Sequence, residues 1–187
     1  MQDGLELAGS GFTLRSWRID DASSLAVQAD NRNIWSNLRG RFPRPYTEPV
    51  ARTWISRCIG GHERGLQLAI EVEGLAVGGI SVDVVTAKAP RIGEIGYWIG
   101  QPYWGRGIAG HAVRLVCAMV YEHLALDCLR ATVRSSNEAS LKILERSGFT
   151  VQSRMRRSDR RPGSAVVEIV YVRDRDESAP VLATTSI

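Results

Sequence analysis

One stretch limits the possible folds of this chain more than any other. It begins with the apolar run Ile95 to Ile99, passes through glycines at Gly105, Gly107 and Gly110, and continues as an amphipathic helix. Glycine lets backbone amides approach a ligand closely, and the first turn of a helix offers unpaired N–H groups and a positive dipole end. The stretch therefore predicts a strand, a turn and a helix that form an anion site suited to phosphate. The same glycines would also suit a simple tight turn.

Two other phosphate-binding loops have to be weighed. Gly105 to Gly110 fits the Gly-x-Gly-x-x-Gly spacing of dinucleotide-binding folds, so spacing alone does not exclude that class. Such a fold opens with a parallel sheet and has an acidic residue at the end of its second strand. Here three antiparallel-looking runs precede the loop, and Arg134 follows the run 128–133. The chain also lacks the Gly-Lys-Ser or Gly-Lys-Thr of a P-loop nucleotidase, so both alternatives are rejected.

The first part of the chain reads as a strand followed by helices. The strand is predicted at 14–18, and Asp20 and Asp21 then cap a helix that carries Leu25 and Val27 inward. Further elements follow in order: a short helix or turn at 31–38, a proline-containing loop at 41–46, and a helix that starts after Thr47 and ends at Gly60-Gly61.

The second part contains most of the predicted strands. Runs at 66–72 and 75–85, joined at Glu73-Gly74, read as an antiparallel hairpin, and 92–99 is the next strand. After the glycine loop we predict a helix at 107–124, a strand at 128–133, a helix at 137–147 and closing strands at 150–157 and 165–172. The fold class is therefore α+β, a mixed sheet in which antiparallel strands precede a βαβα half. Residues 1–173 form one domain and 174–187 a frayed tail.

Composition sets few further limits. The 187 residues, 44% hydrophobic and 24% charged, are typical of a globular domain, and they contain no membrane span or secretory signal, so we expect a cytoplasmic protein. Cys58, Cys117 and Cys128 are widely spaced in apolar surroundings. They are interpreted as buried thiols, with neither a disulfide framework nor a zinc site.

Three segments, in order, resemble the Gcn5-related N-acetyltransferase (GNAT) superfamily in its RimJ/RimL-like branch. They are Glu94 to Ile99, Tyr103 to Ala109 and Asn137 to Phe149, and the resemblance covers roughly Phe12 to Val172. It implies the GNAT fold, an acetyltransferase activity and acetyl-CoA as co-substrate, with no metal.

The resemblance also implies which residues bind the donor. In the family a strand holds the pantetheine arm by backbone bonds and the loop amides hold the pyrophosphate. Trp104 stands where the superfamily usually has Gln or Arg, which removes one polar contact. The implied cofactor-binding residues are Tyr97, Trp98, Ile99, Trp104, Gly105, Arg106, Gly107, Ile108, Ala109, Gly110, Asn137, Ser140 and Lys142.

Acetyl transfer requires a neutral amine, stabilisation of an oxyanion and a proton for the departing thiolate. The resemblance implies Glu94 as the general base, acting directly or through water, although a surface or salt-bridged carboxylate would fit the sequence equally well. Many relatives use a helix tyrosine as the acid, and here that position is Leu144. The Asn-x-x-Ser pattern of the branch gives the role to Ser140, whose alternative is an ordinary helix serine.

The acceptor is the least determined part. Branch resemblance favours a protein or peptide N-terminal α-amine as the acceptor. Three alternatives stay open: a small-molecule acceptor such as an antibiotic or a polyamine, a longer acyl donor, and a non-catalytic acyl-CoA sensor. The loop 39–46, which ends at Tyr46, is predicted to line the substrate site or simply to pack, together with the nearby Trp35 and Trp54. The basic run Arg154 to Arg161 favours a solvated hairpin over a nucleic-acid partner. The oligomeric state is open, a homodimer included.

Overall fold

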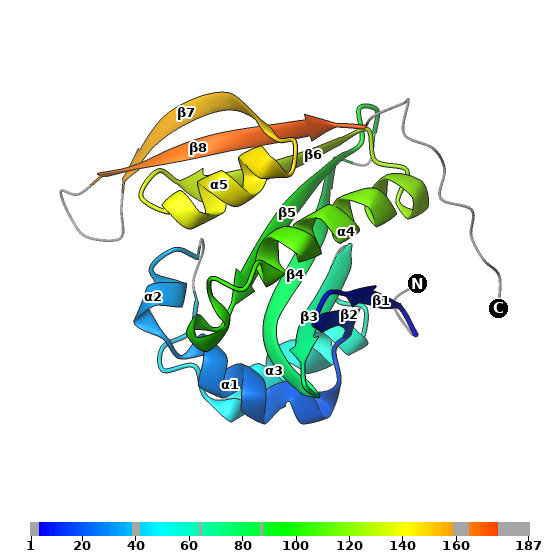
Figure 1. Cartoon of the computed structure of the whole chain (residues 1–187), viewed down its shortest axis with the longest axis vertical. Helices are drawn as coiled ribbons and strands as arrows, with labels where there is room; N and C mark the ends of the chain where they lie inside the picture. The colour runs from blue at the N-terminus through cyan, green and yellow to red at the C-terminus, as the bar shows by residue number, and fades with distance from the viewer. Residues whose placement is uncertain (1–3, 39–41, 64, 87, 159–164, 176–187) are drawn as a thin grey trace.

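A computed structural model describes residues 4–38, 42–63, 65–86, 88–158 and 165–175 (Figure 1). These residues form one eight-stranded sheet in the order β1-β2-β3-β4-β5-β6-β8-β7. All neighbouring strands are antiparallel except β5 and β6, which are parallel. The predicted mixed α+β class is therefore confirmed. The strands are β1 (Glu6–Gly9), β2 (Phe12–Ser16), β3 (Leu66–Val72), β4 (Leu75–Thr86), β5 (Ile92–Ile99), β6 (Cys128–Arg134), β7 (Thr150–Ser158) and β8 (Ala165–Asp174).

The helices cover the two faces of the sheet unequally. Residues of α4 join the larger hydrophobic cluster on one face, and α5 lies on the same side, whereas α1 and α3 pack with the smaller cluster on the other (Figure 1). None of the helices in the described residues is long and apolar enough to cross a membrane. The helical elements are η1 (Ile19–Asp21), α1 (Ala22–Ala29), α2 (Arg32–Trp35), α3 (Glu48–Ile59), η2 (Gln101–Tyr103), α4 (Ile108–His123) and α5 (Glu138–Arg146).

Local sequence explains the central strands well. Glu73 and Gly74 both have positive φ, at 51° and 79°, as a two-residue hairpin turn between twisted strands requires, and β3 and β4 pair as predicted. Along β5, side chains alternate between faces. Ile95 belongs to the cluster under α4, while Trp98 packs against the cluster under α1 and α3.

Several predictions differ from the structure, most of them in the N-terminal part. The first predicted strand lies at Phe12–Ser16, and β1 precedes it without a strong sequence pattern. Val27 is 72% exposed, because it lies two residues, or about 200°, around the helix from the buried Leu25. Cys58 and Cys117 are buried as expected, but Cys128 at the start of β6 is only half-buried.

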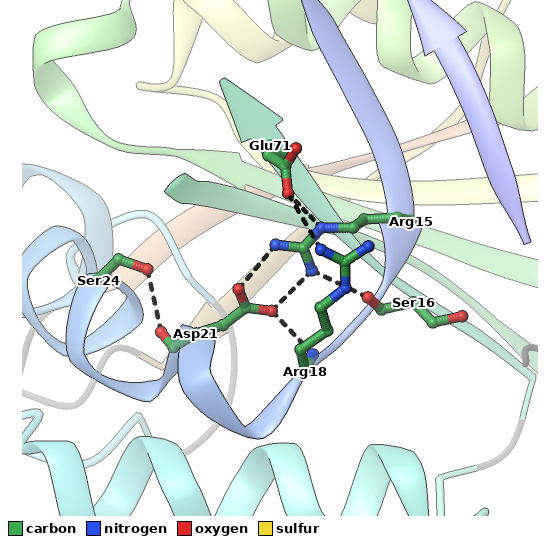
Figure 2. Close-up of polar contacts among 6 residues, drawn as sticks. All are labelled: Arg15, Ser16, Arg18, Asp21, Ser24 and Glu71. Atoms are coloured by element: carbon green, nitrogen blue, oxygen red, sulfur yellow. Dashed lines mark hydrogen bonds and ion pairs between the residues drawn. The ribbon is translucent and has the colours of Figure 1, made fainter. Parts of the chain in front are cut away.

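A charged cluster fixes the junction between β2 and α1 (Figure 2). The buried Arg15 guanidinium donates to both oxygens of Asp21, at 2.8 and 2.7 Å, and also to Glu71 on β3. Asp21 additionally accepts a hydrogen bond from the backbone N–H of Arg18, at 2.8 Å. Its carboxylate therefore closes the η1 turn and makes no side-chain cap on α1, contrary to the prediction. The hydrogen bond to Asp21 raises the pKa of Arg15, so the guanidinium stays charged.

We expect Arg15→Met to cost about 3 kcal/mol or more in the free energy of unfolding, because it leaves the buried Asp21 carboxylate without its cation. Urea denaturation followed by circular dichroism measures the change. Arg52→Met is the matched control: the Arg52–Glu48 pair on α3 is about half exposed on both sides and should cost no more than about 0.5 kcal/mol. Equal losses in the two variants would contradict a special role for the Arg15 cluster.

Candidate active site

The central feature of the site is a gap that opens between two parallel strands. In the described residues β5 and β6 pair only at Ile92↔Cys128, Gly93↔Leu129 and Glu94↔Arg130. Beyond that point β5 continues to pair with β4 as far as Ile99, and β6 continues to pair with β8 as far as Arg134. The two strands therefore separate directly after Glu94, which Figure 1 shows as a widening space between them.

The open edge of β5 carries particular backbone groups. Gly100 donates its N–H to Val77 O of β4, at 2.7 Å, whereas Ile99 O accepts from the indole Nε1 of Trp104, also at 2.7 Å. Because hydrogen-bonding groups alternate along a strand, the backbone of Tyr97 and Ile99 faces the gap and that of Trp98 faces β4. Trp104 thus does make a polar contact, but to its own chain.

The glycine loop connects this edge to α4. Gly105 and Gly107 adopt left-handed φ values of 75° and 76°, and Gly107 is the N-cap of α4. The N-cap glycine makes no side-chain capping bond, and residues 104–107 are exposed. Arg106 projects from the loop with its guanidinium 5.1 Å from the ring centre of Tyr103. An exposed helix N-terminus with uncapped amides suits an anion such as phosphate.

Helix α5 lies across the gap from the open edge of β5. Its N-cap Asn137 accepts a hydrogen bond from the backbone N–H of Ser140, at 3.2 Å. The Tyr97 hydroxyl donates to Ser140 O at 3.4 Å and so joins β5 to the first turn of α5. Burial raises the pKa of Tyr97 to about 12, which keeps this phenol protonated at neutral pH. Ser140 also forms a side-chain hydrogen bond with Tyr97, which opposes the rise in the pKa of this phenol.

Two other positions on α5 have different surroundings. Leu144, at the position of the family tyrosine, is fully buried in the larger cluster. The Lys142 side chain is 66% exposed, with its Nζ 3.9 Å from the carboxylate of Glu138. A proton donor on this helix can therefore come from Ser140 but not from residue 144.

Glu94 lies where the strands separate and is held by two residues of β6. Its Oε2 is 2.7 Å from an Arg130 guanidinium nitrogen, and its Oε1 accepts from Thr132 Oγ1 at 3.4 Å. The carboxylate is half-buried, and its cross-strand neighbour on β4 is Asp83. Burial raises the pKa of Asp83. This ion pair is compatible with both roles that the sequence allows for Glu94, and nothing local in the sequence identifies Arg130 as its partner.

The two residues proposed for the acceptor side have different surroundings. Trp35 is half-buried on α2, with the Arg44 guanidinium 3.4 Å above its ring. Tyr46 is only 6% exposed, stacks on Phe42 at 4.6 Å and donates its backbone N–H to Asp30 at 3.1 Å. Burial raises the pKa of Tyr46 to about 12. Trp35 is thus the more accessible of the two.

Comparison with known proteins identifies the family. The family model for the acetyltransferase (GNAT) domain matches residues 12–150. The chain belongs to this family. It is 30% identical over 160 residues to the uncharacterized N-acetyltransferase p20 of Bacillus licheniformis, which covers 83% of this chain and 88% of that protein. This GNAT domain is thus an acetyltransferase.

Solved structures agree with the fold of the GNAT domain. Mycobacterium smegmatis RimJ in complex with CoA-disulfide superposes with a TM-score of 0.75 at 26% identity, covering 87% of this chain and 81% of that one. The ribosomal-protein-S5-alanine acetyltransferase of Vibrio fischeri gives a TM-score of 0.81 at 18% identity, covering 94% of this chain and 100% of that one. The structural neighbours of this GNAT domain thus include a RimJ protein.

The described part of the basic run lies on β7, which β8 separates from β6. Arg154, Arg156 and Arg157 are exposed on β7, the strand at the far edge of the sheet. The connection around Arg160 and Arg161, and the tail from 176 onward, lie outside the described residues. Charged side chains on an edge strand discourage pairing with another sheet edge.

We expect opposite effects from alanine at two glycines of the loop. Gly107→Ala should cost about 1 to 2 kcal/mol of stability, because a side chain resists the left-handed φ although space is open around it. Gly110→Ala should gain up to about 1 kcal/mol, because Gly110 lies within α4 and a methyl group there meets Arg114 and Ile143 only at 3.7 and 3.9 Å. Thermal unfolding of both variants measures the difference, and a destabilised Gly110→Ala would contradict this account.

Proposed function

We propose that this GNAT domain transfers the acetyl group of acetyl-CoA to the N-terminal α-amine of a protein or peptide. The observation that carries the proposal is the gap between β5 and β6, which opens after Glu94 and leads to the glycine loop at the start of α4. A gap bounded by unpaired strand edge suits an extended amide-containing arm, and the loop suits the phosphates attached to it.

The donor would lie along this gap. Tyr97 and Ile99 would offer backbone groups to the pantetheine amides, with Ile99 O shared with Trp104. Residues 105–110 would hold the pyrophosphate, aided by the charge of Arg106, and Asn137 would contact the arm from the opposite wall. The CoA-disulfide bound to M. smegmatis RimJ supports the assignment of this donor.

The chemistry would use the two sides of the gap. Glu94 would accept the amine proton through a water molecule, because Arg130 and Thr132 already contact both carboxylate oxygens. Ser140, which contacts Tyr97 from the first turn of α5, would donate a hydrogen bond to the departing thiolate. The attacking nitrogen forms the new C–N bond, and the C–S bond of the tetrahedral adduct then breaks.

The basicity of the nucleophile favours an α-amine. An α-amine with a pKa near ~8 costs about 1 kcal/mol to deprotonate at pH 7, whereas a lysine amine near ~10.4 costs about 4 to 5 kcal/mol. Glu94, whose carboxylate is already ion-paired with Arg130, is better suited to an α-amine, which costs less free energy to deprotonate. Structural neighbours with names such as ribosomal-protein-S5-alanine acetyltransferase support a protein acceptor.

A panel of acceptors tests the proposal. We expect peptides with a free N-terminus to release CoA thiol and gain one acetyl group by mass, and the same peptides with a blocked N-terminus and an internal lysine to remain unmodified. Aminoglycosides and polyamines form the third set. Turnover confined to these small amines would contradict the peptide assignment, and tight acetyl-CoA binding without turnover of any amine would indicate a sensor.

Variants test the catalytic roles. Glu94→Gln should lower kcat by about 10²-fold or more, with the Kd for acetyl-CoA little changed, because the base acts only on the amine. Arg130→Gln is its control, since it breaks the same ion pair but keeps the carboxylate. An equal loss in Arg130→Gln would assign the effect to the ion pair.

The acid is tested in the same assay. Ser140→Ala should lower kcat because the thiolate loses its hydrogen-bond donor, whereas Ser153→Ala on the exposed strand β7 should retain full activity. A Ser140→Ala variant with unchanged kcat would remove Ser140 from the mechanism.

A further inference from the structure

One side chain joins the two halves of the proposed site. Gln101 Oε1 accepts hydrogen bonds from the side-chain amides of Asn31, at 2.9 Å, and Asn33, at 3.1 Å. Gln101 begins η2, two residues after the end of β5 at Ile99 and three residues before Trp104. Asn31 and Asn33 belong to the start of α2, the helix that carries Trp35. The contact thus connects the donor loop to the acceptor side.

Helix α2 depends on such contacts for its stability. It has only four residues, and an isolated helical turn is unstable in water. Its N-cap is Asn31, whose Oδ1 accepts from the Asn33 N–H at 2.9 Å while its Nδ2 donates to Gln101. Gln101 therefore orients the capping side chain itself. The buried side chain of Ile34 also anchors this turn.

The donor side of the contact is held just as closely. The Gly100 N–H bonds to Val77 O, and the Trp104 indole bonds to Ile99 O. Gly100 also packs against α1, since a Cβ there would lie 2.1 Å from Gln28 Oε1. Both flanks of Gln101 are thus held by hydrogen bonds or close packing. A change in the mobility of the glycine loop at 105–110 therefore reaches Gln101 through a short segment that is bonded to the sheet.

We propose that Gln101 is a positioning residue that couples occupancy of the donor loop to the stability of α2. This proposal rests on the proposed function in one respect, namely that acetyl-CoA binds the glycine loop. Binding of acetyl-CoA then stabilises the α2 turn through the two amide contacts and so presents Trp35 to the acceptor. Because coupling between two sites is reciprocal, an acceptor that contacts α2 also tightens the binding of acetyl-CoA.

Hydrogen exchange with and without saturating acetyl-CoA tests this directly, without any acceptor. In the native protein we expect acetyl-CoA to slow exchange in residues 105–110, and to slow it about fivefold or more at the backbone amides of Ile34, Trp35 and Ser36. Gln101→Met should keep the effect in the loop and lose it in α2, because methionine has no strong acceptor for the two amides. Gln101→Glu should retain both effects, since a carboxylate oxygen accepts the same hydrogen bonds.

Asn37→Ala is the control for helix stability alone. Asn37 donates to Asn33 O within the α2 region and does not contact Gln101, so this variant should exchange faster but keep the acetyl-CoA-dependent ratio. Slowing in the loop without slowing in α2, or an α2 effect that survives in Gln101→Met, would overturn the proposal. The absence of any slowing in 105–110 would instead contradict acetyl-CoA binding, and with it the proposed function.

Discussion

The arrangement of this GNAT domain depends on one interrupted ladder of hydrogen bonds, the parallel pair β5–β6. Strands in the middle of a sheet normally satisfy their backbone groups on both edges, yet here pairing ends at Glu94 and Arg130. The open edge of β5 has to be completed by something other than a strand. Trp104 completes it at Ile99 O, and the remaining groups face the gap beside α5. The glycine loop, Tyr97 and Ser140 belong to the candidate site because each lies on or beside that edge.

The other structural requirement is that α1 and α2 stay fixed relative to the sheet. Arg15, Asp21 and Glu71 provide this at the start of α1, where a buried guanidinium satisfies carboxylates from two other elements (Figure 2). Removal of one partner from such a cluster is destabilising, because it leaves a buried or half-buried charge without compensation. From α1 the chain runs directly into α2, which meets the end of β5 through Gln101.

Local patterns predicted the centre of the chain much better than its N-terminal part. β5 lies at 92–99 as predicted, and α4 lies at 108–123, because apolar spacing and glycine positions define both. The weak alternation of Glu6–Gly9 did not reveal β1, which forms only because β2 offers it an edge. Asp21 stands where a helix cap is expected from the sequence, but its carboxylate binds the buried guanidinium of Arg15, six residues earlier.

The sequence by itself determined the positive-φ glycines, the hairpin at Glu73-Gly74, the helix after the loop and the family, since each depends on residues close together in the chain. Only the tertiary structure decided that β5 and β6 separate after Glu94, that Arg130 holds this carboxylate, and that Gln101 meets Asn31. These contacts join residues 36 and 70 positions apart. They follow from strand register and helix packing, which depend on the whole core and leave no local pattern in the sequence. The glycine loop can therefore be predicted from the sequence, whereas the open strand edge beside it cannot.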